Sequence, residues 1–446
     1  MFKVEDLLKA TAGRLISGPG GAQVKSVSID SRAVKSAEAF IAIKGERFDG
    51  HDFIREVIKK GVKVIIAHRK LNVDKSVSVI LVKDTVKALG DIARFNRRRF
   101  NIPVIAVTGS NGKTTSKDMI AWVLGAKYKV LKNLGTKNNH IGLPQTLLGL
   151  DKTYDCAVLE IGTNHFGEVG YLARICEPNI GVVTNIGPSH LEFLKGLSGV
   201  YREKYSLIKN LKRPRIAVLN SDDKFLAKHL KKKEKLSFNI GAGINAVSDY
   251  RGASLEVKNA KTRFVVNKKY KFTLNTSGSY NIHNALQAIA IARIFGLDYK
   301  VIAQRLKNFQ FPKGRLNLIE VGGIRFIDDT YNSNPLSLKC ALEALKGIRA
   351  SGKFMIMGDM LELGKGSEEF HAGAVRLALE ACDCLITVGR HSRQACKNIK
   401  SGNKKIFSCE NSTHARELLL GLKPGKGDIV LVKGSRAIKL EEVFKI

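Results

Sequence analysis

The feature that most constrains this chain is a glycine-rich segment between a strand pattern and a helix pattern. The apolar, β-branched run Pro103–Val107 predicts a buried strand, and the segment Thr108–Thr115 (TGSNGKTT) follows it directly. The apolar residues between Met119 and Leu124 then recur at the spacing of one helix face. A strand, a glycine-rich loop containing Lys and Thr, and a helix in this order predict a phosphate-binding loop within a parallel α/β sheet.

Each residue type in this loop suits a nucleotide. Glycines let backbone N–H groups approach phosphate oxygens, and the helix N-terminus adds positive partial charge. The side chain of Lys113 is expected to reach the terminal phosphates, and the Thr114 hydroxyl is expected to ligate Mg²⁺. The predicted ATP contacts are Gly109, Ser110, Asn111, Gly112, Lys113, Thr114 and Thr115. The spacing is a variant of G-x-x-x-x-G-K-[ST], because Val107 stands where that pattern has Gly, and a plain glycine-rich turn is the alternative.

Length and strand patterns predict an α/β protein of three domains. The 446 residues exceed one ordinary core, and we place the domains at residues 1–101, 102–312 and 313–446. A Pro/Gly break at Phe311–Gly314 marks the second boundary, and a predicted helix, Asp84–Phe95, closes the first domain. Strand–helix alternation predicts parallel sheets covered by helices in the second and third domains. Besides Pro103–Val107, the predicted strands are Val27–Ile29, Ala39–Ile43, Val62–Ile66, Val79–Val82, Cys156–Ile161, Gly181–Asn185, Ile216–Asn220, Phe354–Met357, Leu385–Val388 and Ile429–Val432.

Composition narrows the classes of function. The formal net charge is +35, but the basic runs Arg97–Arg99 and Lys231–Lys233 lack interleaved aromatic residues, so we do not expect nucleic acid as a partner. The charge favours solubility and attracts anionic substrates. The start Met1–Asp6 lacks a signal-peptide pattern, and no apolar stretch approaches the roughly 18 residues of a membrane span, so we expect a cytoplasmic chain without membrane insertion. Seven cysteines without metal-site spacing predict reduced thiols.

Polar residues follow or end the predicted strands next to the loop, where ligands of open parallel sheets bind. Glu160 lies in an otherwise apolar strand, and a metal ion on the nucleotide would compensate its burial; pairing with a structural Lys or Arg is the alternative. His190 follows the strand Gly181–Asn185 and is expected to be a second metal ligand, although a lone His is more often simply hydrogen-bonded. Lys204 has no special role on residue pattern alone.

Taken together, these residues resemble the Mur ligases, which build the peptide of peptidoglycan precursors, over essentially the whole chain. In that family the loop reads T-G-[ST]-x-G-K-T-[TS], which accounts for the variant spacing. The resemblance implies that Glu160 and His190 bind Mg²⁺, and that Lys204 is carbamylated and holds a second Mg²⁺. A carbamate is an anionic oxygen donor, which suits this hard cation. Lys113, Glu160, His190 and Lys204 are therefore the expected catalytic residues.

Other segments resemble the family members that add D-alanyl-D-alanine. Asp328–Pro335 (DDTYNSNP) is similar to their Y-N-A-N-P signature with Ser333 in place of Ala, and the D-N-P-R of the members that add the third residue is missing. Gly358–Gly364 (GDMLELG) and Val432–Arg436 (VKGSR) resemble the same members. The implied nucleotide contacts are Asn281, Asn284, Arg315 and Asp329, and the implied substrate contacts are Ser31, Arg32, Lys44, Asp49, Gly50, His51, Asn138, Asn139, Asn332 and Asn334. Around Asn281 the chain reads YNIHN where relatives have H-N-x-x-N.

The resemblance implies an N-terminal UDP-sugar-binding domain, a central P-loop ATPase-like domain and a C-terminal Rossmann-like domain. The implied reaction joins D-alanyl-D-alanine to UDP-N-acetylmuramoyl-tripeptide through an acyl phosphate, with ATP and Mg²⁺, in a monomer. Two alternatives stay open at this point. One is another ligase on the same scaffold, including a folate polyglutamate-type synthetase. The other is a non-catalytic basic protein that uses the loop as an anion site.

Overall fold

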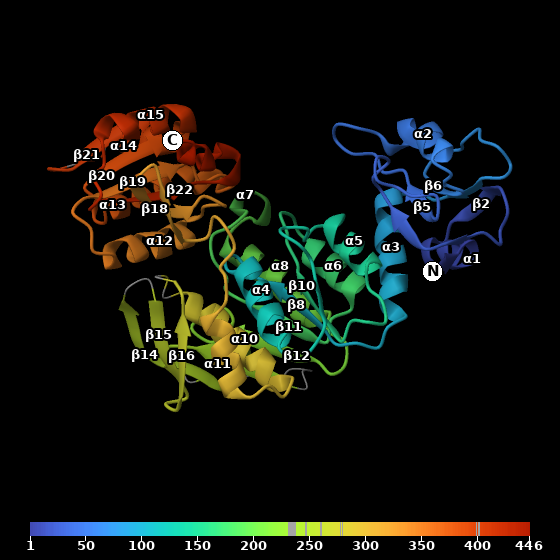
Figure 1. Ribbon diagram of the computed structural model, residues 1–446, viewed down its shortest axis with the longest axis horizontal. Coiled ribbons are helices and arrows are strands. Elements are labelled where there is room, and N and C mark those ends of the chain that lie inside the picture. Colours follow the sequence, from blue (N-terminus) through green and yellow to red (C-terminus); the bar gives the residue numbers. More distant parts are fainter. Residues whose placement is uncertain are drawn as a thin grey trace.

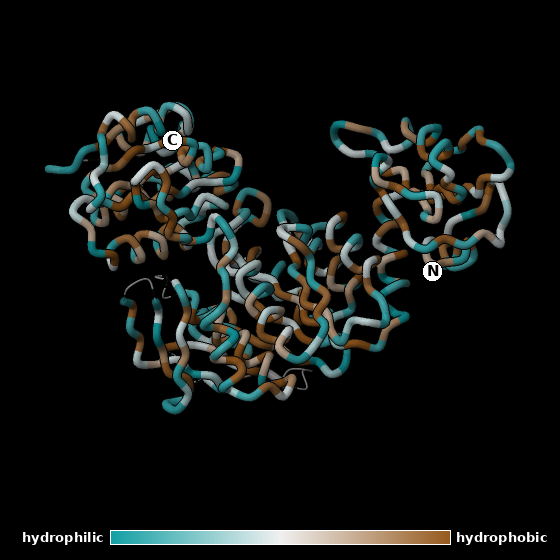
Figure 2. Tube along the Cα trace, in the orientation of Figure 1, coloured by the Kyte–Doolittle hydropathy of each residue, from teal (hydrophilic) through white to brown (hydrophobic). Residues whose placement is uncertain are grey.

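The computed structural model describes residues 1–230, 238–245, 248–258, 261–276, 278, 280–397, 399 and 402–446. The chain forms three sheet-based parts, and the N-terminal and C-terminal parts lie on opposite sides of the central part (Figure 1). Hydrophobic stretches gather inside each part (Figure 2). The predicted α/β fold of three domains is confirmed. The basic run Lys231–Lys233 lies outside the described residues.

The N-terminal part is built on a five-stranded sheet. Its elements are β1 (Phe2–Lys3), α1 (Val4–Thr11), β2 (Arg14–Ser17), β3 (Gln23–Val24), β4 (Ser26–Ser28), β5 (Glu38–Ile41), η1 (Gly50–Phe53), α2 (Ile54–Lys59), β6 (Val64–Ala67), β7 (Ser78–Leu81) and α3 (Thr85–Arg98). The strand order is β2-β7-β6-β5-β4, in which β4 to β7 are parallel and β2 is antiparallel. Asp84 caps α3, because its side chain accepts hydrogen bonds from two backbone N–H groups of the first turn.

The central part contains a nine-stranded sheet with helices on both faces. Its elements are β8 (Val104–Thr108), α4 (Lys113–Leu124), β9 (Val130–Lys132), α5 (Gly142–Leu148), β10 (Cys156–Glu160), α6 (Glu168–Cys176), β11 (Ile180–Val183), α7 (Leu191–Leu194), α8 (Leu197–Lys209), β12 (Ile216–Asn220), α9 (Ala227–Leu230), β13 (Phe238–Gly243), β14 (Tyr250–Lys258), β15 (Lys261–Val266), β16 (Tyr270–Leu274), α10 (Asn281–Ile294) and α11 (Tyr299–Lys307). The order is β16-β15-β14-β13-β12-β11-β8-β10-β9. Side chains of β8 alternate between two cores: Ile105 and Val107 pack with α4 and α10, whereas Val104 and Ala106 pack with α5, α6 and α8.

The expectation of a purely parallel central sheet is wrong at one edge. The pairs β14–β15 and β15–β16 are antiparallel, and strand–helix alternation does not extend to them. In β15 buried and exposed residues alternate, which is the pattern of an antiparallel strand with one solvated face. The six adjacent strands β13, β12, β11, β8, β10 and β9 include the strand before the phosphate loop and its neighbours, and they are parallel as predicted.

The C-terminal part is a six-stranded sheet between two helical layers. Its elements are β17 (Asn317–Val321), β18 (Ile324–Asp329), α12 (Pro335–Gly347), β19 (Lys353–Gly358), η2 (Gly364–Gly366), α13 (Ser367–Leu379), β20 (Cys384–Val388), α14 (Arg390–Cys396), β21 (Lys405–Cys409), α15 (Ser412–Leu422), β22 (Ile429–Lys433), η3 (Arg436–Ile438) and η4 (Leu440–Phe444). The order is β17-β18-β22-β19-β20-β21. The β17–β18 pair is antiparallel, which again departs from the parallel prediction, and the other pairs are parallel.

Two further predictions concern cysteines and membranes. All seven cysteines are free thiols, five of them buried, as expected for reduced side chains in apolar surroundings. Burial raises the pKa of the Cys156 and Cys176 thiols to about 12, so they stay protonated. No described helix combines the length and apolarity that a bilayer crossing requires.

The basic run at the end of α3 forms hydrogen bonds and ion pairs that connect the N-terminal part to the central part. Arg97 is buried, and its guanidinium donates to the carbonyl oxygens of Cys176 (3.1 Å), Phe100 (2.7 Å) and Ile102 (3.1 Å). Arg94 and Arg98 both pair with Glu177 at the end of α6. Arg97 and Arg98 of the run, together with Arg94 one turn earlier, therefore have a structural role.

We predict that Arg97→Met destabilises the chain by about 2 kcal/mol or more, because it leaves buried carbonyl groups without donors. Thermal unfolding followed by circular dichroism measures the loss as a lower Tm. The matched control is Arg99→Met, whose exposed side chain is expected to change stability by no more than about 0.5 kcal/mol. Equal effects of the two substitutions would contradict the role of Arg97.

Candidate active site

The predicted phosphate loop joins the end of β8 to the start of α4, and two of its glycines are required by close contacts. Gly109 has φ 148°, and a Cβ there would lie 1.8 Å from Thr184 Oγ1. Gly112 has φ 80°, and a Cβ there would lie 2.5 Å from Asn284 Oδ1. A side chain at either position would displace a neighbouring element, so the loop keeps its course only with glycine.

Two residues of the loop, Ser110 and Asn111, bond to the segment after β11, the strand that pairs with β8. Ser110 Oγ donates to the Gly187 carbonyl oxygen (2.8 Å), and the Ser110 N–H donates to the Asn185 carbonyl oxygen (3.0 Å). The Asn111 N–H donates to Asn185 Oδ1 (3.0 Å). Ser110 and Thr115 are both buried. The polar side chains predicted to meet the nucleotide thus also fix the loop between β8 and β11.

Lys113 is the first residue of α4, and its ammonium folds back over the loop. Lys113 Nζ donates to the carbonyl oxygens of Gly109 (2.9 Å) and Ser110 (3.3 Å). Burial lowers the pKa of Lys113, and nearby Glu160 opposes that shift. This position places a cation directly above the loop backbone, as a lysine that contacts terminal phosphates requires.

Glu160 ends β10 next to the loop, and one of its two carboxylate oxygens has no hydrogen-bond partner among the described residues. Its side chain is 1% exposed, and Oε1 accepts a hydrogen bond from Asn138 Nδ2 (2.6 Å). Within the described residues Oε2 is buried without a hydrogen-bond partner. An unpartnered buried carboxylate oxygen is costly unless a cation meets it. The position therefore fits a hard cation such as Mg²⁺.

The donor set around Glu160 also fits Mg²⁺ in kind. The described residues contain no cluster of three or more His, Cys, Asp or Glu side chains that would enclose a metal ion. Mg²⁺ at nucleotide sites is commonly held by one or two protein oxygens, water and phosphate oxygens, so a full protein cage is not needed. The Thr114 hydroxyl, which was predicted as a ligand, accepts a hydrogen bond from Arg315 Nη2 (3.0 Å).

His190 is held by the C-terminal part. Its Nδ1 lies 2.5 Å from Glu362 Oε2, which leaves Nε2 as the ring nitrogen for any metal. A carboxylate that fixes one ring nitrogen while the other binds metal is a common arrangement. The bond with His190 is the largest cause of the lowered pKa of Glu362. The metal-ligand role of His190 stays a prediction.

Lys204 is a buried amine in α8. It is 1% exposed, and burial together with the nearby charge of Lys113 holds its pKa well below the usual value. Both effects favour the neutral amine, which is the form that reacts with CO₂. Lys204 therefore has the chemistry that carbamylation requires, although its pattern in the sequence resembles that of a surface lysine.

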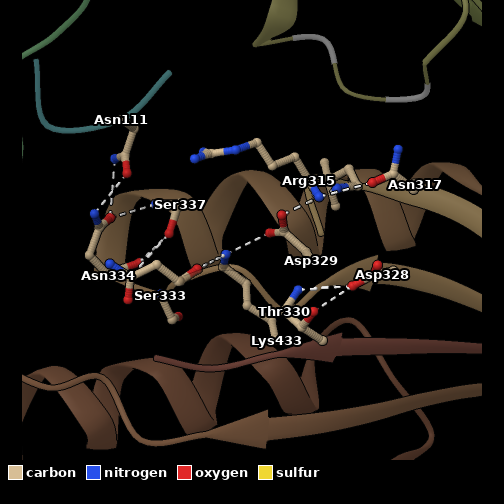
Figure 3. Close-up of polar contacts among 12 residues, drawn as sticks. Asn111, Arg315, Asn317, Asp328, Asp329, Thr330, Ser333, Asn334, Ser337 and Lys433 are labelled. Atoms are coloured by element: carbon tan, nitrogen blue, oxygen red, sulfur yellow. Dashed lines mark hydrogen bonds and ion pairs between the residues drawn. The ribbon is translucent and has the colours of Figure 1, made fainter. Parts of the chain in front are cut away.

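Residues of the C-terminal part contact the phosphate loop (Figure 3). Asn334 and Asn111 form a reciprocal amide pair, with N···O distances of 2.7 and 3.1 Å, and Asn334 also caps α12. Arg315 reaches Thr114 and lies over the Tyr331 ring, 4.0 Å from its centre. Three of the predicted contacts, Arg315, Asn111 and Asn334, are thus brought together.

Asp329 and Asn332 are both bonded to Lys433, a buried cation next to these contacts. Lys433 Nζ donates to Asp329 Oδ2 (2.5 Å) and to the Asn332 carbonyl oxygen (2.9 Å). Burial raises the pKa of Asp329, and Lys433 opposes that shift. Lys433 holds the turn that bears Asn332 and Asn334, a role that a Lys in a strand pattern does not reveal in sequence.

Asn281 and Asn284, predicted to face the adenosine, are buried in α10. Asn284 Oδ1 accepts from Ser116 Oγ (3.0 Å), and Asn284 Nδ2 donates to Asn281 Oδ1 (3.0 Å). These bonds connect α10 to α4 and support the loop from behind. Contact with adenosine stays a prediction. A cavity of about 370 Å³ opens beside Thr114, between Trp122 of α4 and the segment Phe309–Pro312.

Asn138 and Asn139, which are both predicted substrate contacts, have different surroundings. Asn138 contacts the Glu160 carboxylate, whereas Asn139 Oδ1 accepts the N–H groups of Ile141 (3.2 Å) and Gly142 (2.9 Å) at the start of α5. Asn139 thus has a capping role that sequence reasoning missed.

The residues predicted to hold the UDP-sugar lie in the N-terminal part. Ser31 and Arg32 follow β4, and Lys44, Asp49, Gly50 and His51 follow β5. Because β4 and β5 are parallel neighbours, these segments lie at one edge of the sheet, where ligands of such sheets bind. Arg32 pairs with Asp30, and Asp49 Oδ1 accepts from the His51 backbone and lies 2.6 Å from its Nδ1.

Comparison with known proteins matches all three parts of the chain. The matching family descriptions are "Mur ligase family, catalytic domain" over residues 23–104, "Mur ligase middle domain" over 107–292 and "Mur ligase, glutamate ligase domain" over 314–436. A UDP-N-acetylmuramoyl-tripeptide–D-alanyl-D-alanine ligase of Bacillus subtilis is 36% identical, over 95% of this chain and 93% of the relative. The Escherichia coli protein of the same name is 32% identical, over 94% and 93%.

Solved structures agree with these relatives. A crystal structure of MurF from Acinetobacter baumannii has a TM-score of 0.91 at 31% identity and covers 99% of this chain and 97% of its own. The MurF ligase of Thermotoga maritima in complex with ADP has a TM-score of 0.84 at 30% identity, over 94% and 96%. With a phosphate loop, a buried carboxylate beside it and similarity over nearly its full length, this chain belongs to the Mur ligase family.

Proposed function

We propose that this chain is an ATP-dependent ligase that joins D-alanyl-D-alanine to UDP-N-acetylmuramoyl-tripeptide, the activity that the names of its relatives state. One observation carries the proposal. The loop that carries Lys113 lies beside the unpartnered oxygen of Glu160 and is contacted by Arg315 and Asn334 of the C-terminal part. This arrangement brings phosphate-binding groups of the central part against residues of the signature that resembles D-alanyl-D-alanine-adding ligases.

The reaction needs an activated acid, because a free carboxylate is a poor electrophile. The tripeptide carboxylate attacks the γ-phosphorus of ATP, which gives an acyl phosphate and ADP. The amine of D-alanyl-D-alanine then attacks the acyl carbon, and phosphate leaves as the amide forms. Lys113 and Arg315 neutralise charge on the phosphoryl oxygens, and the loop backbone fixes their position.

Mg²⁺ is part of this proposal. When bound, it would offset the charge of the phosphate oxygens. Glu160 and Thr114 would hold one Mg²⁺ with oxygen donors and His190 with Nε2, and Lys204 would hold a second Mg²⁺ with a carbamate oxygen. The carbamate forms when the neutral amine of Lys204 attacks CO₂ and loses one proton. The lowered pKa of Lys204 supports this step.

The remaining assignments follow from the same reaction. We propose that residues 1–101 hold the UDP-sugar through the edge formed by β4 and β5, and that residues 102–312 and 313–446 form the central and C-terminal domains. We propose that Asn138, which is bonded to Glu160, and Asn332 with Asn334, which is bonded to Asn111, meet the acyl and acceptor substrates. We propose a monomer, because one chain supplies both the phosphate loop and the residues Arg315 and Asn334 that contact it. We propose a cytoplasmic location, because the reaction consumes ATP.

The purified chain is expected to convert UDP-N-acetylmuramoyl-tripeptide, D-alanyl-D-alanine and ATP into the UDP-pentapeptide and ADP, as measured by mass spectrometry. Tripeptides ending in lysine and in meso-diaminopimelate are assayed separately, so that the third residue the enzyme accepts is identified. ADP release that needs neither peptide would contradict the proposal and favour a simple anion-binding or ATPase protein.

Lys113→Ala is expected to keep the fold and lower kcat by on the order of 10²-fold or more, because a preorganised cation over the phosphates is lost. Steady-state kinetics measures the loss, and circular dichroism and Tm verify the fold. Wild-type turnover in a folded Lys113→Ala protein would refute the role of the loop in catalysis.

Lys204→Ala is expected to be inactive and to regain part of its activity with short carboxylates such as formate or acetate, which supply the missing anionic oxygen. The matched control is Lys209→Ala, which changes an exposed lysine on the same helix and should keep wild-type activity without any effect of carboxylates. A Lys204→Ala enzyme that is fully active would rule out the carbamate.

A further inference from the structure

Lys117 is a second buried cation of α4, one turn after Lys113, and the proposed reaction assigns it no role. Its side chain is 1% exposed. Lys117 Nζ donates to the carbonyl oxygens of Asn133 (2.8 Å) and Gly135 (3.4 Å) and lies 3.4 Å from Asp118 Oδ1. The ammonium thus has three acceptors, which is what its burial requires.

The carbonyls that Lys117 holds begin the loop after β9, which returns to Glu160. Asn133 is fully buried, and its Oδ1 accepts the Glu160 N–H (2.8 Å) while its Nδ2 donates to the Glu160 carbonyl oxygen (3.0 Å). Asn133 Nδ2 also donates to the Lys137 carbonyl oxygen (3.0 Å), which closes the loop on itself. Next in the chain, Asn138 donates to the Glu160 carboxylate at 2.6 Å.

These bonds form one path from the helix of the phosphate loop to the carboxylate of Glu160. The path runs from Lys117 to Asn133, through the loop to Asn138, and ends at Glu160 Oε1. It fixes one carboxylate oxygen and leaves the other, Oε2, unpartnered. A carboxylate held at one oxygen has a defined direction for the other, and partners of this kind tune metal affinity in proteins.

We propose that Lys117 is a positioning residue that anchors the loop Asn133–Asn138 and so orients Glu160 Oε2 toward its cation. The inference rests on the proposed metal role of Glu160. It also predicts the direction in which the metal affinity changes when Lys117 is replaced. By Coulomb's law, removing a cation near Glu160 strengthens the binding of a divalent metal, whereas loss of orientation weakens it.

The test is binding of Mn²⁺ to the full chain with saturating ADP, followed by electron paramagnetic resonance of the free ion. Lys117→Met keeps the length of the side chain but removes its donors and charge. We expect the Kd for Mn²⁺ to rise at least tenfold. A Kd that is unchanged or lower in the folded variant overturns the proposal, because charge alone then accounts for Lys117.

Two controls separate this proposal from the one on which it rests. Lys132→Met removes the same charge from the more exposed partner of Asp118 and should leave the Kd within twofold of wild type. Glu160→Gln should weaken Mn²⁺ binding on its own. If it does not, the metal role of Glu160 fails; if it does and Lys117→Met binds like wild type, only the role of Lys117 fails.

A double-mutant cycle tests the path itself. If Lys117 acts through Asn138, Lys117→Met combined with Asn138→Ala should bind Mn²⁺ no more weakly than Asn138→Ala alone. Additive losses would overturn the path. If Lys117→Met does not fold, Asn138→Ala alone decides: a raised Kd supports the hold of the loop on Glu160, and an unchanged Kd overturns it.

Discussion

The site depends on how closely the phosphate loop can approach its neighbours. At Gly109 the backbone lies against Thr184, which belongs to the loop after β11, and at Gly112 it lies against Asn284 of α10. These contacts draw the strand ends and the helix N-terminus onto one small surface, where backbone N–H groups can converge on an anion. A methyl group at either glycine would separate those elements, and Lys113, Glu160 and Asn334 would no longer share a site.

Charge is the second constraint, and it favours the proposed pairing of an anion with a metal ion at the site. Lys113 and Lys204 are buried close enough for the charge of one to lower the pKa of the other, and Glu160 interacts with Lys113 and Lys117. At the phosphate loop, the cations Lys113 and Arg315 therefore outnumber the one carboxylate, Glu160, that interacts with Lys113. A triphosphate reverses this balance, and Mg²⁺ at Glu160 Oε2 would then restore it. Carbamylation of Lys204, as proposed, would add to the negative charge of the triphosphate, because it replaces an amine with an anion.

The strands and the phosphate loop could be predicted from the sequence because the patterns that indicate them lie within a few consecutive residues. Buried parallel strands such as Cys156–Ile161 and Ile216–Asn220 are continuous apolar runs, and the observed strands lie within two residues of the predicted ones. Sequence reasoning missed the antiparallel edge β14–β16, whose alternating pattern does not continue the strand–helix rhythm. It also missed Lys117 and Lys433. A lysine in a helix or strand pattern predicts an exposed side chain. These two lysines are buried because carbonyl and carboxylate groups distant in the chain accept their hydrogen bonds.

The contacts between the C-terminal part and the loop have a consequence for nucleotide binding. Arg315 donates to the Thr114 hydroxyl, and Asn334 is bonded to Asn111, so residues from two parts meet where the proposed ligand binds. A hydroxyl that accepts this bond still has lone-pair capacity, but a guanidinium close to Thr114 opposes a cation there. Binding of Mg²⁺ and phosphate would be compatible with this arrangement if Arg315 moved from the hydroxyl to a phosphoryl oxygen, exchanging a neutral acceptor for a charged one. A phosphoryl oxygen adds the attraction between opposite charges to this hydrogen bond, so the nucleotide itself supplies the driving force for that exchange.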